Sequence, residues 1–317
     1  MTGTNRARFR GYALVLCGAV LFGIAASLSK LLLTMGLAPV ELSFYSQLVA
    51  GLLFLPSVRW RMFVRRDWRI LLFLGSVGGA VAPILFYVGI ARTTAANAAM
   101  LQNGEPLFTI GFAYLLLGER VLRRGYAMIA AIAAGAFVVA TNLEFSDAAF
   151  APFLAGNLLL IGASAFWGLD NTASAVITRR VSIPAVLGVR LLLGCVFLTP
   201  VIAATNTSLA VPTDAIPLLV GYSVLTIAVY ATALYYAFRT IGPLRSGAIL
   251  STSALWGVLF AVLLFPNQLP SGTQLGGGAV MVLALIGLYW LGEPYSAEGP
   301  LTPEALNVSA RDGPRSP

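Results

Sequence analysis

The chain has 317 residues, of which 58% are hydrophobic and only 10% are charged, with a mean hydropathy of +0.86. Soluble domains carry about 25% charged residues, so this composition indicates a polytopic membrane protein rather than a soluble domain. The chain has no histidine, which removes the commonest proton shuttle and the commonest metal ligand.

Ten mostly apolar stretches follow one another along the chain, with short connections between them. A helix needs about 20 such residues to cross a membrane. The first stretch follows the basic segment MTGTNRARFR as in a signal peptide, but it is too long and many more stretches follow, so it is interpreted as the first span. The sequence therefore predicts an all-α protein with ten transmembrane helices. The predicted spans are 11–34, 40–57, 70–91, 95–117, 125–142, 151–176, 184–204, 215–238, 244–265 and 274–292.

The basic residues gather on one side of these spans. If the N-terminus is inside the cell, seventeen arginines lie in inside segments, Arg92 and Lys30 lie outside, and Arg190 lies within a span. Cytoplasmic segments typically carry such an excess of Lys and Arg. We therefore predict a multi-pass protein of the inner (plasma) membrane with two cytoplasmic tails, residues 1–10 and a disordered segment, residues 293–317. The excess of basic residues in the cytoplasmic segments then accounts for the net charge of +8, so no nucleic-acid partner is expected.

The chain contains an internal repeat. A shift of 149 residues aligns LFYVGIARTTAANAAML (85–101) with LYYAFRTIGPLRSGAIL (234–250). The repeat predicts two halves of five spans each, residues 11–142 and residues 151–292. Because five is odd, the second half must enter the membrane in the opposite orientation. Inverted repeats of this kind are common in secondary transporters, which bind substrate between the halves near the middle of the membrane.

Three charged residues fall inside the predicted spans: Glu105, Asp170 and Arg190. Such charges cost roughly 2.5–3.5 kcal/mol each on insertion scales, so each is a candidate for function. Glu105 lies near the middle of the fourth span and would bind a cationic group or a proton. Alternatively, it ties its helix to a neighbour by a hydrogen bond. Asp170, with Asn171 beside it, either forms a structural salt bridge with Arg190 or lines the cavity.

The residues around Glu105 predict a polar break in the fourth span. Pro106 has no N–H, so the carbonyl of Gln102 is expected to lose its helical partner. Gly104 permits close backbone approach, and Gln102 and Asn103 add polar groups for binding. A break of this kind is tolerated where protein or a water-filled cavity surrounds it. We therefore expect this segment to line a cavity.

The second half differs at the corresponding place. Ala254-Leu255 stand where the first half has the acid and the proline, so both the charge and the helix-kinking residue are absent there. Ser251, Thr252 and Ser253 instead give the ninth span a polar stripe. Their hydroxyls would bind a neutral part of a substrate or hydrogen-bond to another helix.

Aromatic residues form a second group of binding candidates. Trp167, Tyr230 and Trp256 would stack on an organic cation or an aromatic solute. The alternative for each is core packing or a place in the interfacial aromatic belt. Tyr235 and Tyr236, near the cytoplasmic end of the eighth span, are expected to belong to that belt.

Three features of the sequence are characteristic together: Phe22-Gly23 in the first span, Trp167-Gly168 in the sixth, and the run TAANAAMLQNGEPLFTIGFAYLLLGER (94–120). By these features the chain resembles the EamA branch of the drug/metabolite transporter superfamily over residues 11 to about 292. The resemblance implies ten helices around a central cavity and transport of small solutes such as amino acids or other metabolites, often outward. The second half departs from the usual pattern at Ala254-Leu255 and at Gln268, where the family often repeats the Glu-Pro pair and the terminal Glu.

We therefore expect a secondary transporter, acting outward, of small metabolites such as amino acids or of drug-like organic solutes, by alternating access and without a cofactor or metal. The solute and the lipid bilayer are its expected partners. The alanine-rich span 125–142 and the run Gly276-Gly277-Gly278 are close-packing surfaces, within the monomer or across a homodimer. The alternative functions are a channel and a membrane enzyme, but no filter-like loop and no catalytic motif supports either.

Overall fold

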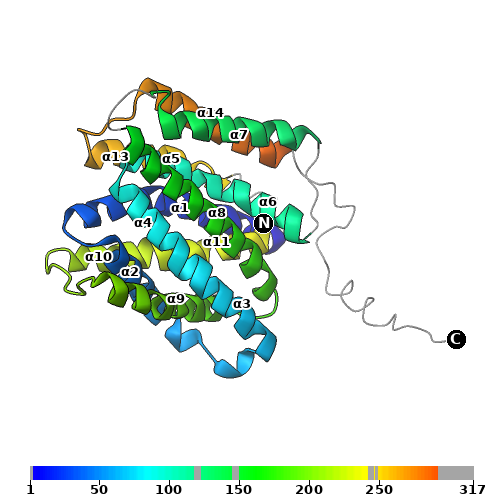
Figure 1. The fold of residues 1–317 in the computed structure, drawn as a ribbon. Coiled ribbons are helices and arrows are strands. Elements are labelled where there is room, and N and C mark those ends of the chain that lie inside the picture. Colours follow the sequence, from blue (N-terminus) through cyan, green and yellow to red (C-terminus); the bar gives the residue numbers. More distant parts are fainter. Residues whose placement is uncertain (1–2, 118–122, 145–149, 242–245, 247–248, 292–317) are drawn as a thin grey trace.

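The structure is a computed structural model that describes residues 3–117, 123–144, 150–241, 246 and 249–291 (Figure 1). Those residues are helical and contain no strand. Six helical stretches have the length and composition to cross a membrane: Phe9–Thr34, Pro39–Ser57, Arg65–Ala91, Phe153–Ile177, Ile183–Thr205 and Ile216–Ala237. Shorter apolar helices are Gly125–Thr141, Ser253–Leu264 and Gly272–Leu288. The predicted all-α membrane class is confirmed.

Six of the ten predicted spans correspond to helical stretches long enough to cross a membrane, whereas the other four, 95–117, 125–142, 244–265 and 274–292, correspond to shorter or interrupted helices among the described residues. Helix α1 begins at Gly3, so most of the predicted tail 1–10 is helical, and the predicted tail 293–317 lies outside the described residues. The predicted first half corresponds to α1 (Gly3–Thr34), α2 (Pro39–Phe54), α3 (Arg65–Ser76), α4 (Ala82–Ala91), α5 (Ala95–Leu101), α6 (Glu105–Leu117) and α7 (Arg123–Thr141). The second half contains α8 (Phe150–Ile177), α9 (Ile183–Thr205), α10 (Ile216–Tyr222), α11 (Tyr230–Ile241), α13 (Ser253–Leu264) and α14 (Gly272–Leu291).

Three pairs of consecutive helices are joined directly by turns of a different geometry. A π turn, Val77–Val81, joins α3 to α4, and a second π turn, Ser223–Val229, joins α10 to α11. A 3-10 turn, Gln102–Gly104, joins α5 to α6. The two π turns occupy corresponding places in the repeat, because a shift of 149 residues carries Val77 onto Thr226. Turns of this kind inside helices are frequently found at functional sites.

The break in the fourth span does not arise as predicted. The carbonyl of Gln102 keeps a partner, because it accepts a hydrogen bond from the N–H of Glu105 in the 3-10 turn. Pro106 lies in the first turn of α6, where backbone N–H groups have no acceptor within the helix. The N–H that proline lacks therefore costs no helical hydrogen bond. A turn at Ser251 and Thr252 precedes α13 at the corresponding place, although no proline follows it. Both halves therefore have the break, and only the first has the charge.

The helices of the two halves pack against each other in a reciprocal way. Helix α1 packs against α11 and α13, and α8 packs against α4 and α6. The first span of each half thus contacts the third and fourth spans of the other. Helix α2 packs against α9. Helices α7 and α14 lie side by side at one edge of the bundle, and both contact α5 (Figure 1).

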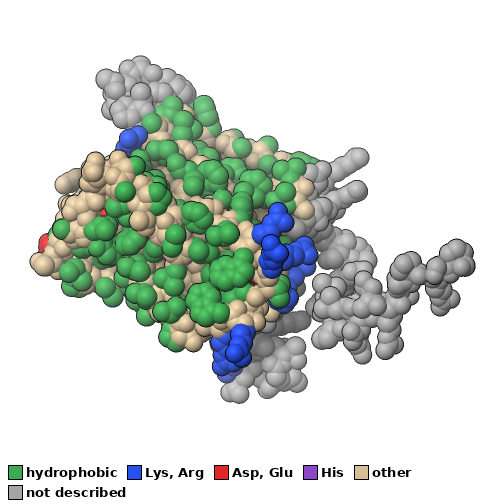
Figure 2. Space-filling view, turned by 60° about the horizontal axis from the view of Figure 1, so that its bottom comes forward, with side chains coloured by type: hydrophobic (Ala, Val, Ile, Leu, Met, Phe, Trp, Pro, Cys, Tyr) green, Lys and Arg blue, Asp and Glu red, His purple; other side chains and the backbone are tan. Residues whose placement is uncertain are grey.

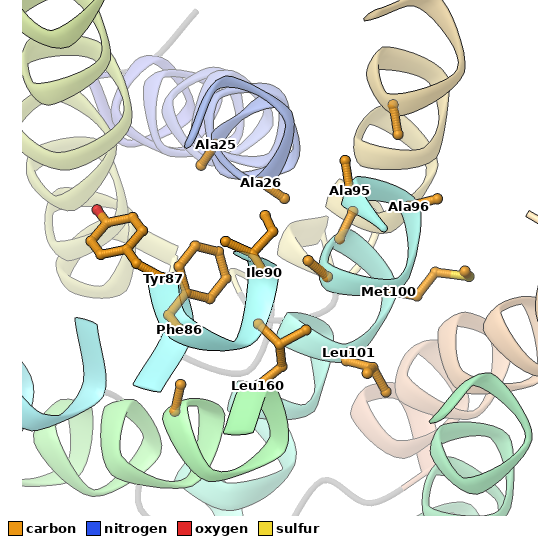
Figure 3. Packing of buried hydrophobic residues seen from close by; sticks show 14 of the residues in the cluster. Ala25, Ala26, Phe86, Tyr87, Ile90, Ala95, Ala96, Met100, Leu101 and Leu160 are labelled. Carbon is orange, nitrogen blue, oxygen red and sulfur yellow. The ribbon is translucent and has the colours of Figure 1, made fainter. Parts of the chain in front are cut away.

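The largest apolar cluster lies where α1, α4, α5 and α8 meet. Figure 3 shows Ala25 and Ala26 of α1 close to Phe86 and Ile90 of α4, with Leu160 of α8 below them. All five side chains are less than 10% exposed. Alanines on α1 and α5 let the helices approach closely, which is how helices associate in a membrane, where apolar burial alone gives no driving force.

The outer surface is predominantly apolar. Figure 2 shows hydrophobic side chains over the middle of the visible face, with Lys and Arg side chains mainly along one edge. Large apolar side chains more than 60% exposed include Leu115, Val196, Leu255, Leu263 and Leu283. So much exposed apolar surface is rare on soluble monomers and is expected of a surface in contact with lipid.

Helices α7 and α14 meet backbone to backbone at two glycines. A Cβ placed on Gly277 would lie 2.9 Å from the carbonyl oxygen of Gly135, and one on Gly135 would lie 2.7 Å from the carbonyl oxygen of Gly277. No atom lies within 4 Å of the corresponding position on Gly276. The two predicted small-residue surfaces therefore pack against each other within one chain.

This contact predicts opposite effects for two neighbouring substitutions. We expect Gly277→Ala to lower the thermal unfolding temperature in detergent, because the new methyl group collides with the backbone of α7. Gly276→Ala is the matched control and should raise that temperature slightly, since Ala is favoured over Gly in helices by about 1 kcal/mol. Equal effects of the two substitutions would contradict the contact.

Candidate functional site

A cavity of about 110 Å³ lies between the two halves, lined by residues of α1, α2, α4, α6, α8, α9, α10 and α11 and of all three irregular turns. The predicted site residues that line it are Gln102, Glu105, Trp167, Asp170, Asn171 and Tyr230. Asn103, Ser251 and Trp256 lie outside the lining. The cavity therefore brings together the two acids and two of the three candidate aromatic residues.

Glu105 is the first residue of α6 and is only 6% exposed. The Nδ2 of Asn171 donates a hydrogen bond to its Oε1 at 2.6 Å. This bond joins the fourth span to the sixth and so crosses between the predicted halves. Because the dipole of a helix favours a negative charge at its N-terminus, the break before α6 places this carboxylate in a suitable position.

Asp170 and Arg190 form an ion pair inside the bundle. The Oδ2 of Asp170 lies 2.9 Å from Nη1 of Arg190, and the two side chains are 1% and 11% exposed. Nη1 of Arg190 also donates to the hydroxyl of Tyr235 at 3.4 Å. Both of the alternative interpretations of Asp170 are met, because the pair forms and both its members line the cavity.

The π turn between α3 and α4 makes room for this pair. A Cβ on Gly78 would collide with the carboxylate of Asp170, so only glycine fits there. The prediction for Tyr235 was wrong: it is 5% exposed and lines the cavity, whereas its neighbour Tyr236 is 40% exposed, as a belt residue would be. The difference arises because Tyr235 lies on the side of α11 that packs against Arg190 of α9.

The amides beside Glu105 hold helices together. The Nε2 of Gln102 donates to the carbonyl of Phe22 on α1 at 2.9 Å. Asn103 donates to the carbonyl of Ala99 at 2.9 Å and accepts from the Oγ of Ser253 at 3.1 Å. The break of the fourth span is thus tied to α1 and to the break before α13. Asn103 is a structural residue in this arrangement rather than part of the cavity wall.

Glycines bring the first span of each half close to the fourth span of the other half, just after its break. A Cβ on Gly23 of α1 would lie 2.6 Å from the carbonyl oxygen of Ser253, and one on Gly168 of α8 would lie 2.7 Å from the amide nitrogen of Thr109. A Cβ placed on Gly104 would lie 3.9 Å from its nearest neighbours, which is an ordinary van der Waals contact. The close backbone approach predicted for Gly104 therefore does not occur at this residue. The close approach therefore occurs at the glycines of the FG and WG pairs.

The other two predicted binding residues of the ninth span belong to the packing. Ser251 is fully buried. The Cβ of Trp256 would lie 2.8 Å from a Cβ on Gly23, so this residue packs against α1. Trp256 lies away from the cavity because its side of α13 faces α1, a rotation that the sequence pattern alone does not specify.

Aromatic rings form two pairs on the cavity wall. The rings of Phe22 and Tyr230 are stacked, with centroids 4.8 Å apart. Those of Phe86 and Trp167 are tilted, with centroids 5.2 Å apart. All four residues line the cavity. The prediction that Trp167 and Tyr230 lie on a cavity wall agrees with this placement.

Several polar lining residues were missed by the sequence analysis. The hydroxyls of Tyr87 on α4 and Tyr222 on α10 lie 2.8 Å apart and join the two halves, with Ser46 3.4 Å from Tyr87. Gln47 of α2 also lines the cavity. The internal repeat aligns FY (86–87) with YY (235–236), which was a partial indication that Tyr87 is a candidate residue. Nothing in the sequence distinguished Tyr222 or Gln47 in this way.

The size of the cavity limits what it holds in this arrangement. Typical ligand pockets measure roughly 300–1,000 Å³. At about 30 Å³ per water molecule, 110 Å³ holds roughly three or four waters, or one small organic group. Binding of anything larger requires the surrounding helices to move apart.

Comparison with known proteins identifies the family. A model of the EamA-like transporter family matches residues 9–141 and again residues 154–290. A protein named "uncharacterized transporter" from Methanothermobacter thermautotrophicus is 29% identical over 310 residues, covering 92% of this chain and 89% of that protein. The pseudopaline exporter CntI of Pseudomonas aeruginosa is 27% identical over 112 residues, covering 35% of this chain and 39% of the exporter.

A solved structure, described as the crystal structure of a protein, superposes with a TM-score of 0.60 at 17% identity, covering 90% of this chain and 97% of that one. At this identity the likeness concerns the fold alone. The family matches, in contrast, span most of the chain and include Glu105, Asp170 and Arg190. This chain belongs to the EamA-like transporter family, as its resemblance to that branch of the drug/metabolite transporters predicted.

Proposed function

We propose that this protein is a secondary transporter that moves a small metabolite or drug-like organic solute outward by alternating access. Ten spans form two inverted halves in the inner membrane, with both chain ends in the cytoplasm. The double family match and the reciprocal packing of α1 and α8 support this arrangement. The outward direction is supported by the relative named as an exporter, which matches 35% of this chain.

The observation that carries the proposal is a cavity with buried charges at the junction of the halves. Charges inside a membrane are retained mostly where they bind or move a solute or ion. The bond from Asn171 to Glu105 and the bond between Tyr87 and Tyr222 both cross this junction. A rocking motion of the halves would break and remake such bonds as the cavity opens to one side and then to the other.

A channel and a membrane enzyme remain the alternative functions, and transport kinetics distinguish them. A screen for thermal stabilisation by amino acids, polyamines, nucleosides and organic cations would first supply a ligand. Uptake of that ligand into proteoliposomes should then saturate and show counterflow if the protein is a carrier. Flux that neither saturates nor shows counterflow would identify a channel, and chemical conversion of the ligand would identify an enzyme.

We expect Glu105→Gln to lower uptake into proteoliposomes by roughly tenfold or more and to abolish its dependence on pH. A hydrogen bond to a charged group contributes about 1.5–3 kcal/mol, and an amide can neither carry the charge nor exchange a proton. The substituted side chain keeps its shape and can still accept from Asn171, so folding should be preserved.

Glu144→Gln is the matched control, because Glu144 is exposed after the end of α7 and does not line the cavity. It should leave both the rate and the pH dependence unchanged. Uptake by the Glu105→Gln protein that keeps the wild-type pH dependence would contradict a coupling role for this residue.

We expect Asp170→Asn and Arg190→Gln each to lower the free energy of unfolding by about 3–5 kcal/mol, because each leaves a buried charge unpaired. The double substitution should recover most of that loss, as measured by denaturant unfolding in detergent. Its transport should remain impaired, because both side chains line the cavity. Wild-type transport by a recovered double variant would instead assign the pair to structure alone.

The second ion pair offers a control for this experiment. Arg180 pairs with Asp67, but its side chain is 49% exposed. Because exposed pairs contribute only about 0–1 kcal/mol, Arg180→Gln should cost far less than Arg190→Gln. A comparable loss of unfolding free energy from both substitutions would show that burial of the ion pair does not determine its contribution to stability.

A further inference from the structure

We propose that the cavity selects small organic monocations, and that Glu105 is the group that receives the positive charge. This inference rests on the transporter function proposed above and deepens it by naming the class of substrate. It is carried by the charges on the cavity wall, by the bonds those charges already make and by the aromatic rings beside them.

The charges on the wall do not balance. Among the described residues that line the cavity, two are acidic, Glu105 and Asp170, and one is basic, Arg190. Arg190 pairs with Asp170 at 2.9 Å, so these two charges compensate each other. Glu105 has only the neutral amide of Asn171 as its hydrogen-bond partner, and no described basic side chain lies within ion-pair distance of it. One carboxylate is therefore left for a cation or a proton to compensate.

The alternative is a solute with a carboxylate of its own, which would need a free basic group. Arg190 is already engaged by Asp170 and by the Tyr235 hydroxyl. Drawing it toward a solute would leave Asp170 buried without its partner, which is strongly unfavourable. Without breaking this pair, an anion or a zwitterion could accept hydrogen bonds from the unpaired Nε of Arg190 and the hydroxyl of Tyr230, but it would bring its negative charge to a wall that is already negative.

Unpaired polar atoms on the wall are compatible with an ammonium donor. The Oδ1 of Asp170 and the Oε1 of Gln47 are buried acceptors without a hydrogen-bond partner. The Nε of Arg190 and the hydroxyl of Tyr230 are also unpaired. Since both acceptors and donors are available, hydrogen bonding alone does not select a class of solute. The surplus negative charge does.

The aromatic rings supply a further preference for cations. Phe22 with Tyr230 and Phe86 with Trp167 line the same cavity as Glu105. The face of an aromatic ring attracts an alkylammonium group, most strongly when water is excluded. The small volume of about 110 Å³ favours one charged amine with a short apolar body over a polyamine or a larger solute.

Four solutes with the same short alkyl body test this inference: n-propylamine as the cation, 1-propanol as the neutral form, 2-aminobutyrate as the zwitterion and butyrate as the anion. Binding to the purified full-length protein in detergent is followed by tryptophan fluorescence and by thermal stabilisation. We expect the amine to bind at least tenfold more tightly than each of the other three. Equal or tighter binding of the zwitterion or the anion, or binding of none of the four, would overturn the inference.

Variants then assign the charge to one residue. Glu105→Gln should remove the preference for the amine over the alcohol, whereas Glu105→Asp, which keeps the charge, and Glu144→Gln should retain it. An unchanged preference in a folded Glu105→Gln protein would overturn the role of Glu105. If that variant does not fold, the wild-type series and a retained preference in Glu105→Asp still decide between the classes of solute.

Counterflow of the solute that binds separates this inference from the function on which it rests. Counterflow of the zwitterion without binding of the amine would overturn the cation selectivity and leave the transporter function intact. Binding of the amine without counterflow of any of the four solutes would support the cation site and contradict the carrier.

Discussion

The ion pair between Asp170 and Arg190 is the constraint on which much of the surrounding structure depends. Two charges removed from water are tolerated only with close geometry and further hydrogen bonds. The 2.9 Å contact and the Tyr235 hydroxyl supply these, and the π turn with Gly78 provides space for the carboxylate. The pair still leaves Oδ1 of Asp170 and Nε of Arg190 unmatched, which is more readily explained by a solute site than by stability alone.

The broken helices place a second carboxylate beside this pair. Both halves interrupt their fourth span, and the helix that follows each break packs closely against a glycine of the other half's first span, Gly168 or Gly23. The break and the glycine contact beside it occur in both halves and are structural. The charge of Glu105 exists in one half only, so the scaffold is repeated whereas the chemistry is asymmetric. Proline is not required for the break, since the second half forms it without one.

Bonds across the junction link solute binding to movement in the proposed cycle. A cation that reaches Glu105 would compete with Asn171 for the carboxylate and so weaken one bond between the halves. The tyrosine pair Tyr87–Tyr222 is a second bond of this kind, made by neutral groups. A hydrogen bond of this kind contributes about 0.5–1.5 kcal/mol, so the loss of one would shift the balance between two arrangements by roughly two- to tenfold.

The sequence by itself determined the membrane class, the places of the helices and the three intramembrane charges. These follow from apolar length and from the rarity of charge in lipid, which are local properties of the chain. Only the tertiary structure decided what each polar group contacts: Asn171 for Glu105, Arg190 for Asp170, Tyr222 for Tyr87, and the packing of Trp256 away from the cavity. These contacts depend on how each helix is rotated against its neighbours. An almost uniformly apolar helix carries little sequence signal for that rotation, because its lipid-facing and protein-facing sides are alike.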